Sequence, residues 1–349
     1  MSISSRSTPS RPTQVLLLVD DKPGHSNQVE GLARIVAEHV DLKVERRRID
    51  LAAFARGPIR RFIARHARRS RTFWVRVLFG IDLSRLTPPD VVITSGVKTL
   101  SAGRFVAAHF GAKLINCGLA DSDDRRHCTA VLVPFTGFVR EPNMVYCPTP
   151  NLVQPEQLSV PRKLGRESDF AGADASLLLG GPSQEFDYSE AEWRVIADFV
   201  RKSGSDLGIR WTVAGSRRTP DAASVLFTEL ARAGVCRYFD YRATGSLSMS
   251  ELYSADLVVL TEDSLSMFCE ALASRRPVCT IRPASVEASL QDEIVENALL
   301  KRQACRLRIA DLDIETFLEA ILRVEPSAVD YRGEIWRAVE PLFAPAAAR

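Results

Sequence analysis

The chain has 349 residues, of which 46% are hydrophobic and 26% are charged. This content suits domains with sizeable cores and excludes a disordered chain, and no apolar stretch approaches the ~20 residues that span a bilayer. Residues 1–150 carry 23 Lys and Arg against 13 Asp and Glu, whereas residues 151–349 carry 23 against 30. We therefore expect the two halves to have different partners.

The N-terminal segment and the cysteines indicate the compartment. Residues 1–12 are polar, are expected to be disordered, and lack the apolar core of a secretory signal. Seven cysteines are scattered without paired short spacings, which favours reduced thiols over disulfides or a zinc site. We therefore expect a cytoplasmic protein with no metal and no cofactor.

The first domain is predicted at residues 13–150. Val29, Leu32, Ala33 and Val36 recur at helical spacing. Apolar or alternating runs predict strands at 14–19, 42–49, 91–94, 113–116 and 130–133. A proline-rich stretch follows, and we expect an interdomain linker at 151–172.

The second domain is predicted at residues 173–325. Helices are expected at 190–201 and 221–233, and strands at 175–179, 209–214, 257–260 and 278–281. Strands that alternate with helices predict the α/β class, with two Rossmann-like parallel-sheet domains. The closing segment 326–349 is expected to be a helix that can cross back to the first domain.

Ligands bind beyond the carboxyl ends of parallel strands, so the loops at those ends are the candidate sites. In the first such loop Gly24 permits a tight turn, His25 can act as a general base, and Asn27 and Gln28 offer amide groups. The alternative is a polar turn in which Ser26 or Asn27 caps a helix.

A second loop in the first domain, with Ser95, Gly96 and Lys98, can present amides and an ammonium group to an anion. The alternative there is an ordinary helix start.

The second domain offers two more loops of this kind. Gly180 and Gly181, followed by Ser183, permit close backbone approach to a ligand. Arg217 and Arg218, next to Ser216, can hold a diphosphate as a charged fork. Pro220 suits the first turn of a helix, and Thr219 is the expected cap.

The most informative loop joins the strand at 255–260 to a predicted helix. Ser264 stands where an N-cap would stand, and the free amides of Ser264, Leu265 and Ser266 can hold a phosphate. Thr261, Glu262 and Asp263 precede them, and Glu270 can reach a ribose. The two adjacent acids seldom suffice for Mg²⁺. The alternative is an ordinary capped helix.

Three of these loops resemble a known family. Asp21-Lys-Pro-Gly-His-Ser-Asn-Gln28, Ser216-Arg-Arg-Thr-Pro220 and Thr261-Glu-Asp-Ser-Leu-Ser-Met267 with Glu270-Ala271 are similar to the mitochondrial-fission (elongated-mitochondria) protein family, which has many bacterial members. That family resembles type-B glycosyltransferases, whose two Rossmann-like domains face each other across a cleft.

The resemblance implies a nucleoside-diphosphate sugar donor in the second domain and a glycan or lipid acceptor in the first. His25, with Asp20 or Asp21 behind it, takes the place of the base, and Asp21 is our second catalytic candidate. The acceptor side comprises Gly24, Asn27, Gln28, Ser95 and Gly96. The donor site comprises Gly180, Gly181, Ser183, Ser216, Arg217, Arg218, Thr261, Glu262, Ser264, Leu265, Ser266 and Glu270.

The sequence departs from the family pattern at two places. Pro134-Phe-Thr-Gly137 stands where a His-Asp pair is usual, and Gly245-Ser-Leu-Ser-Met249 stands where an Asn-Pro-Tyr segment is usual. These departures indicate either another substrate or weakened catalysis. Two functions therefore remain: a metal-independent glycosyltransferase, or a noncatalytic scaffold that recruits protein or membrane partners.

Residues 52–80 carry eight arginines and no acidic residue, with apolar side chains between them. Such a helix can lie on an anionic membrane, which would put the protein at the inner face of the membrane near a lipid-linked acceptor. The alternative is a helix that packs in the domain while its arginines are solvated. No nucleic-acid-binding motif accompanies the segment, so nucleic acid is not an expected partner.

Overall fold

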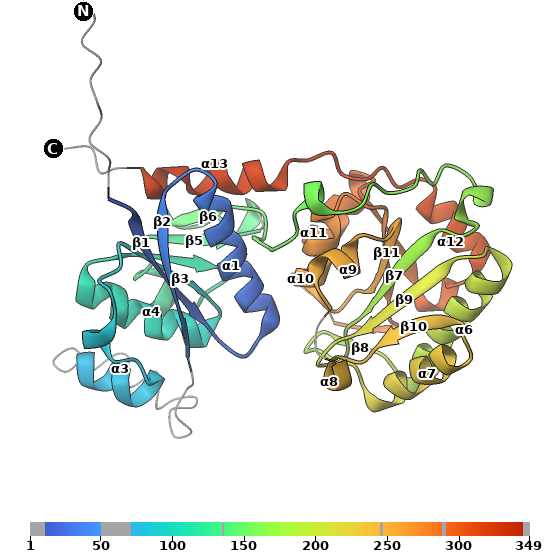
Figure 1. Cartoon of the computed structure of the whole chain (residues 1–349), viewed down its shortest axis with the longest axis horizontal. Coiled ribbons are helices and arrows are strands. Elements are labelled where there is room, and N and C mark those ends of the chain that lie inside the picture. The colour runs from blue at the N-terminus through green and yellow to red at the C-terminus, as the bar shows by residue number, and fades with distance from the viewer. Residues whose placement is uncertain (1–10, 50–70, 135, 245–246, 288–290, 345–349) are drawn as a thin grey trace, which may run out of the picture. The chain divides into compact units, whose positions relative to one another are not determined.

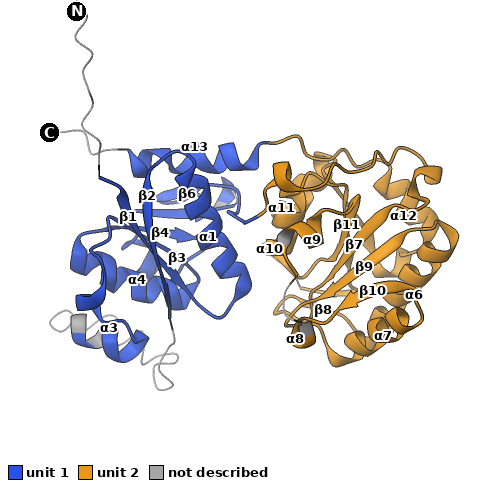
Figure 2. Ribbon diagram, viewed as in Figure 1, with its two compact units in different colours: residues 1–152, 330–349 blue, residues 153–329 orange. Residues whose placement is uncertain are grey.

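The computed structural model describes residues 11–49, 71–134, 136–244, 247–287 and 291–344 (Figure 1). It divides into two compact units, shown in Figure 2: unit 1 comprises residues 1–152 and 330–349, and unit 2 comprises residues 153–329. Among the described residues, no helix combines the length and the apolarity that crossing a membrane requires.

Unit 1 contains one parallel sheet of six strands. Their order is β2 (Leu42–Arg48), β1 (Thr13–Val19), β3 (Val91–Ser95), β4 (Lys113–Cys117), β5 (Ala130–Val133) and β6 (Met144–Tyr146). Side chains alternate across β1 because successive residues of a strand point to opposite faces. Val15, Leu17 and Val19 therefore join one core cluster, and Leu16 and Leu18 join the other.

Helices cover both faces of this sheet. α1 (Pro23–Ala37) and α13 (Tyr331–Phe343) pack against the first cluster, while α3 (Arg71–Phe79) and α4 (Val97–Phe110) pack against the second. The described part of the unit also contains the short helix α5 (Ser122–Arg125) and 3₁₀ turns at Leu83–Arg85 and Thr136–Phe138. α13 enters from the end of the chain and buries Ile335 and Val339 beside α1.

Unit 2 repeats the architecture with a second parallel sheet of six strands. Their order is β10 (Cys236–Phe239), β9 (Arg210–Gly215), β7 (Asp174–Leu179), β11 (Leu257–Thr261), β12 (Val278–Arg282) and β14 (Ala304–Arg308). β8 (Phe186–Asp187) and β13 (Ser285–Val286) form a separate antiparallel pair. The helices are α6 (Glu190–Asp206), α7 (Asp221–Arg232), α8 (Tyr241–Thr244), α9 (Met249–Tyr253), α10 (Leu265–Ala273), α11 (Gln291–Leu300) and α12 (Ile314–Ile321).

Residues 153–172, which the sequence analysis assigned to a linker, belong to unit 2 in this division. They include 3₁₀ turns at Pro155–Gln157 and Glu167–Phe170. Phe170 is fully buried in the core of the unit, and the amide of Arg162 donates to the carboxylate of Asp256 at 2.7 Å.

The nine predicted strands are confirmed, each to within one residue at either end. The helix predicted at 190–201 continues to Asp206. It begins with a capping box, in which Ser189 and Glu192 each accept a hydrogen bond from the backbone of the other. The strands β6, β10 and β14 were not predicted, and two of the core-covering helices, α11 and α12, were also missed.

Candidate functional site

The strand order of unit 2 contains one switch point. From β7 the chain proceeds through β9 to β10 on one side of the sheet, and later through β11, β12 and β14 on the other. The loops after β7 and β11 therefore diverge in opposite directions, and such a point is where open α/β sheets bind ligands. Gly180 and Gly181 follow β7, and Glu262, Asp263 and Ser264 follow β11.

The glycine turn after β7 touches both neighbouring loops. The amide of Gly180 donates to Oγ1 of Thr261 at 2.7 Å, and that of Gly181 donates to Oδ2 of Asp263 at 3.1 Å. A Cβ atom on Gly180 would lie 2.0 Å from Oδ2 of Asp263, and one on Gly181 would lie 2.0 Å from the carbonyl oxygen of Arg218. Only glycine allows these three loops to approach so closely.

Thr219 closes the loop after β9. The sequence analysis wrongly expected it to cap α7. The N-cap of α7 is Pro220, not Thr219. The buried hydroxyl of Thr219 instead donates to the carbonyls of Leu179 and Gly180, and it accepts from the amide of Ser216 at 2.7 Å. Ser216 in turn donates to the carbonyl of Gly180 at 3.2 Å. These bonds hold the loops after β7 and β9 together.

Arg218, predicted to contact a diphosphate, is anchored by an acidic side chain. Its Nη2 atom lies 2.6 Å from Oδ2 of Asp263, whose side chain is fully buried. Burial raises the pKa of Asp263, and the nearby Arg218 guanidinium opposes this effect without cancelling it. The second carboxylate oxygen, Oδ1, has no hydrogen-bond partner among the described residues. Arg217 is exposed.

Glu262 has its carboxylate in a buried ionic cluster. Oε2 accepts from Oγ1 of Thr280 at 2.8 Å and from Nε of Arg306 at 2.7 Å, while Oε1 pairs with Arg282. Arg282 and Arg306 lie on β12 and β14, so this carboxylate ties the end of β11 to both of these strands. The amide of Glu262 donates to the hydroxyl of Tyr188 at 2.8 Å.

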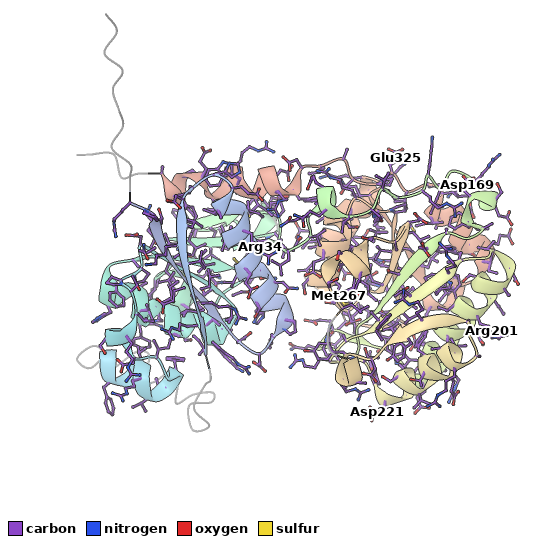
Figure 3. The ribbon with its side chains drawn as sticks, in the orientation of Figure 1. Arg34, Asp169, Arg201, Asp221, Met267 and Glu325 are labelled. Carbon is purple, nitrogen blue, oxygen red and sulfur yellow. The ribbon has the colours of Figure 1, made fainter. Side chains whose placement is uncertain are left out.

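α10 begins at the predicted position, with Ser264 as its N-cap residue. The Ser264 side chain makes no capping hydrogen bond, and the first turn carries no acidic side chain. Among the described residues, none accepts from the amides of Leu265, Ser266 or Met267. Figure 3 labels Met267 on this first turn of α10. These amides and the positive end of the helix dipole are suited to an anion.

Two further predicted donor residues have protein partners. Glu270 is buried on α10 and accepts from the hydroxyl of Tyr253 at 3.0 Å. Burial raises the pKa of Tyr253 well above its usual value, and Glu270 adds to the effect. The hydroxyl of Ser183 accepts from the amides of Glu185 and Phe186, which shapes the turn before β8.

Unit 1 has an equivalent switch point, between β1 and β3. Nδ1 of His25 lies 3.0 Å from Oδ2 of Asp20, directly after β1. Gly96 follows β3 with a positive φ of 85°, and a Cβ atom there would lie 2.3 Å from the His25 ring. Ser95 donates to Oε1 of Gln28 at 2.8 Å. Residues from both loops therefore surround the histidine.

The local structure around His25 differs from the loop that the sequence analysis expected and from its alternative, a polar turn. α1 begins at Pro23 with Lys22 as its N-cap, so neither Ser26 nor Asn27 is the cap. Gly24, His25, Asn27 and Gln28 all lie on the helix. Asp21 accepts from Nζ of Lys98 at 3.3 Å, whereas the carboxylate on His25 is that of Asp20.

The pKa of Asp20 indicates which nitrogen of His25 carries the proton. Burial works to raise the pKa of Asp20, but the hydrogen bonds from His25 and from the amide of Lys22 outweigh it, so that this pKa lies below its usual value. An ionised Asp20 accepts the Nδ1 proton of His25, which leaves Nε2 free to take a proton from a substrate.

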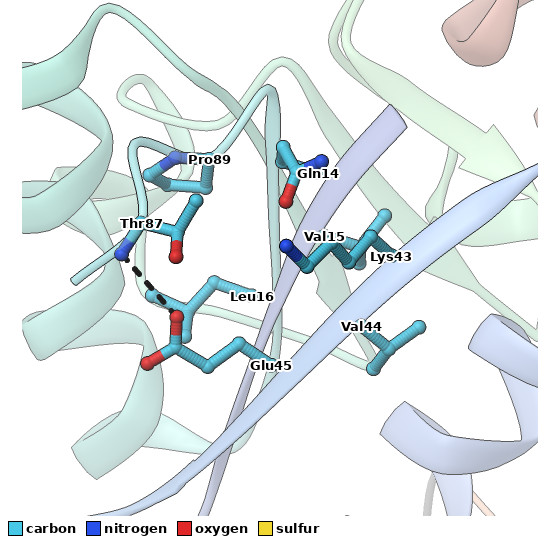
Figure 4. A pocket seen from close by; sticks show the side chains of 8 residues that line it. All are labelled: Gln14, Val15, Leu16, Lys43, Val44, Glu45, Thr87 and Pro89. Carbon is cyan, nitrogen blue, oxygen red and sulfur yellow. Dashed lines mark hydrogen bonds between the residues drawn. The ribbon is translucent and has the colours of Figure 1, made fainter. Parts of the chain in front are cut away.

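A cavity of about 210 Å³ lies elsewhere in unit 1 (Figure 4). It is lined by the amino-terminal halves of β1 and β2 and by the loop before β3, at Gln14, Val15, Leu16, Lys43, Val44, Glu45, Thr87 and Pro89. It therefore lies away from the carboxyl ends of the strands. Among the described residues, no group of three or more His, Cys, Asp or Glu side chains is arranged to hold a metal ion.

Several predictions of the sequence analysis fall partly or wholly on residues outside the described part of the chain. These are the N-terminal segment, most of the basic segment 52–80, and the family departures at positions 135 and 245–246. Sequence reasoning left open whether Asp20 or Asp21 stands behind His25, and the structure pairs Asp20 with it. It missed the contact of Asp263 with Arg218 and that of Tyr253 with Glu270.

Two parallel α/β units, each with polar and glycine-rich loops at its switch point, define a protein of the glycosyltransferase type-B-like fold. The chain belongs to the family described as Mitochondrial fission ELM1, whose model matches residues 23–316. A curated relative, uncharacterized protein RP120 of Rickettsia prowazekii, is 24% identical over 134 residues. That match covers 38% of this chain and 38% of the relative.

Solved structures share the fold at low sequence identity. S. aureus MnaA, in a structure with UDP, has a TM-score of 0.58 at 11% identity and covers 95% of both chains. UDP-GlcNAc 2-epimerase from Methanocaldococcus jannaschii has a TM-score of 0.57 at 13% identity, over 95% of this chain and 100% of its own. HepE from Anabaena, in complex with UDP and glucose, has a TM-score of 0.51 at 12% identity over the same shares.

Proposed function

We propose that this protein transfers a sugar from a nucleoside-diphosphate sugar to a glycan or lipid acceptor of the cell envelope, at the cytoplasmic face of the membrane. The observation that carries the proposal is the meeting of the glycine turn, Arg218 and the start of α10 around the switch point of unit 2. Proteins of the same fold described as complexes with UDP, or with UDP and a sugar, support it.

The donor half of the reaction requires stabilisation of a leaving diphosphate. The bond between the anomeric carbon and the diphosphate oxygen breaks, and negative charge grows on the nucleoside diphosphate. The amides of Leu265 and Ser266 and the dipole of α10 supply fixed positive potential for that charge without a metal. Arg217 and the outer edge of Arg218 add guanidinium donors.

The acceptor half of the reaction requires a base. Nε2 of His25 takes the proton of the acceptor hydroxyl as its oxygen bonds to the anomeric carbon, while Asp20 holds the opposite ring nitrogen. Asp20 thereby selects the tautomer and stabilises the imidazolium that forms. Gly96 leaves room for the ring, because a side chain there would overlap it.

The acceptor and the membrane location rest on the basic segment at 52–80, most of which lies outside the described residues. Flotation of the full chain with liposomes tests this part. Binding to vesicles that contain anionic lipids at low salt, lost at high salt, is the expected result. Charge reversal at Arg60, Arg61, Arg68 and Arg69 should weaken it. Failure to float at low salt would remove the membrane from the proposal.

A thermal-shift screen tests the donor site. We expect one of UDP, GDP, CDP and dTDP, or its sugar, to raise the melting temperature, because a ligand that binds only the native state stabilises it. Incubation with radiolabelled donor and membrane extract then follows the sugar into product. A flat response to every nucleotide would favour the noncatalytic scaffold.

A further inference from the structure

We propose that Asp263 is the positioning residue of the donor site: its buried carboxylate ties Arg218 and the Gly180–Gly181 turn to the start of α10 as one preassembled anion site. This inference rests on the proposed function and deepens it. Asp263 does not itself meet the ligand, because its side chain is fully buried. It acts through Arg218.

Three loops converge on this one carboxylate. Oδ2 of Asp263 accepts from the amide of Gly181 at 3.1 Å and from Nη2 of Arg218 at 2.6 Å. The same Nη2 atom lies 3.4 Å from the Asp263 carbonyl oxygen. Asp263 itself stands two residues before the first residue of α10. Its position therefore fixes the loops after β7 and β9 relative to the helix whose amides face the ligand.

The arrangement prepares Arg218 for an anion. Asp263 holds Nη2 of Arg218, while 34% of the Arg218 side chain remains exposed. A guanidinium fixed in this way loses less rotational freedom when it binds a phosphate than a freely moving one does. Arg218 also neutralises the carboxylate, which would otherwise repel a diphosphate.

The buried carboxylate of Asp263 lowers the stability of the fold. Its Oδ1 atom is buried with no partner among the described residues, and burial raises its pKa despite the adjacent arginine. An unsatisfied buried carboxylate oxygen lowers stability. The neighbouring Glu262 shows the contrast, because both of its oxygens are paired. Features that cost stability locally are typical of functional sites.

A double-mutant cycle on the full chain tests the inference, with UDP as the probe, or whichever of GDP, CDP and dTDP binds most tightly. Asp263→Asn should weaken the Kd measured by calorimetry about tenfold, which is within the range of couplings between contacting residues. In an Arg218→Gln background the same change should alter Kd less than about twofold, because its effect passes through Arg218.

Asp256→Asn is the matched control. Asp256 is a buried aspartate at the other end of the same strand, where it accepts from the amides of Arg162 and Asp174. This change should lower the melting temperature and leave Kd unchanged. Equal weakening by Asp263→Asn in both backgrounds, or unchanged affinity in the single variant, would overturn the inference alone. If the wild type binds none of the four nucleotides, the proposed function and the inference both fail.

If Asp263→Asn does not fold, Arg218→Lys decides the matter with Asp263 intact. Lysine keeps the charge but lacks the planar fork that spans carboxylate and phosphate. Weaker binding at an unchanged melting temperature supports the positioning role, and wild-type affinity contradicts it.

Discussion

Oδ2 of Asp20 lies 3.0 Å from Nδ1 of His25, five residues further along the chain. The two residues flank the junction between β1 and α1, so the strand end and the first helical turn bring them together. The Asp20 side chain is almost fully buried, whereas that of His25 is 27% exposed. The pair therefore presents one ring nitrogen outward and holds the other inside.

Asp20→Asn should lower turnover by about a hundredfold, a loss within the range that general-base catalysis contributes. The amide cannot stabilise an imidazolium, and it permits the wrong histidine tautomer. Nucleoside-diphosphate release from the donor identified by screening measures this effect, and the affinity for the nucleotide should not change.

Asp21→Asn is the control for that experiment. Asp21 is half-exposed and pairs with the exposed Lys98, and surface pairs of this kind contribute little. We expect turnover within about twofold of the wild type, because the loss of a weak surface pair has a small effect. A large loss in Asp21→Asn with a small one in Asp20→Asn would show that the catalytic carboxylate had been misassigned.

Gly180→Ala should destabilise the protein by about 1–3 kcal/mol and abolish the nucleotide-dependent thermal shift, because the added methyl group would overlap the carboxylate of Asp263. Gly204→Ala is the matched control. Gly204 lies on α6, and a Cβ atom there would lie 3.6 Å from its nearest neighbour, the carbonyl oxygen of Ile209, so alanine should stabilise by about 0.5–1 kcal/mol. Chemical denaturation measures both changes, and an unaffected Gly180→Ala would contradict the packing.

Glu262→Gln should lower the free energy of unfolding by about 3 kcal/mol, because it leaves Arg282 and Arg306 without the buried charge that they share. Glu296→Gln removes an exposed partner of the same Arg306 and should cost less than about 1 kcal/mol. Urea titrations compare the two variants. A donor-binding role for Glu262 would appear instead as lost affinity at unchanged stability.

The stability of Asp263→Asn relative to the wild type should depend on pH. The pKa of Asp263 is raised in the folded protein, so its ionisation destabilises the fold as the pH rises from the ordinary value of 3.8 through the folded-state value. Below pH 3.8 the carboxyl is protonated in both states and this contribution is constant. Denaturation at pH 4 and pH 7 should show the variant gaining on the wild type at the higher pH. A variant that loses stability relative to the wild type between pH 4 and pH 7 would contradict the raised pKa.

The sequence predicted the central strands well and the outer ones poorly. Central strands are buried on both faces and show as apolar runs, such as residues 15–19 and 257–260. Within the two six-stranded sheets the missed strands are β6, β10 and β14, and all three lie at sheet edges. Arg237 and Arg306 interrupt two of them, because an edge strand needs fewer apolar side chains.

The positions of the site loops followed from the sequence, but the direction of each side chain did not. Residues 262 and 263 are adjacent acids, and only the structure distinguishes the one that pairs with β12 and β14 from the one that holds Arg218. The same holds for residues 20 and 21. The partners Lys98, Arg218 and Arg306 come from distant parts of the sequence, so local spacing carries no signal for them. His25 is close to both Asp20 and Asp21 in sequence, so its spacing alone does not choose between them.

The position of α13 bears on how the protein is made. Ile335 and Val339 complete the core of unit 1, yet they are synthesised only after the whole of unit 2. A nascent chain therefore carries an unfinished first unit, with an uncovered apolar surface beside α1, until the ribosome has translated the last helix. Domains generally fold as units during synthesis, so the second unit can mature first and chaperones have time to engage the earlier one.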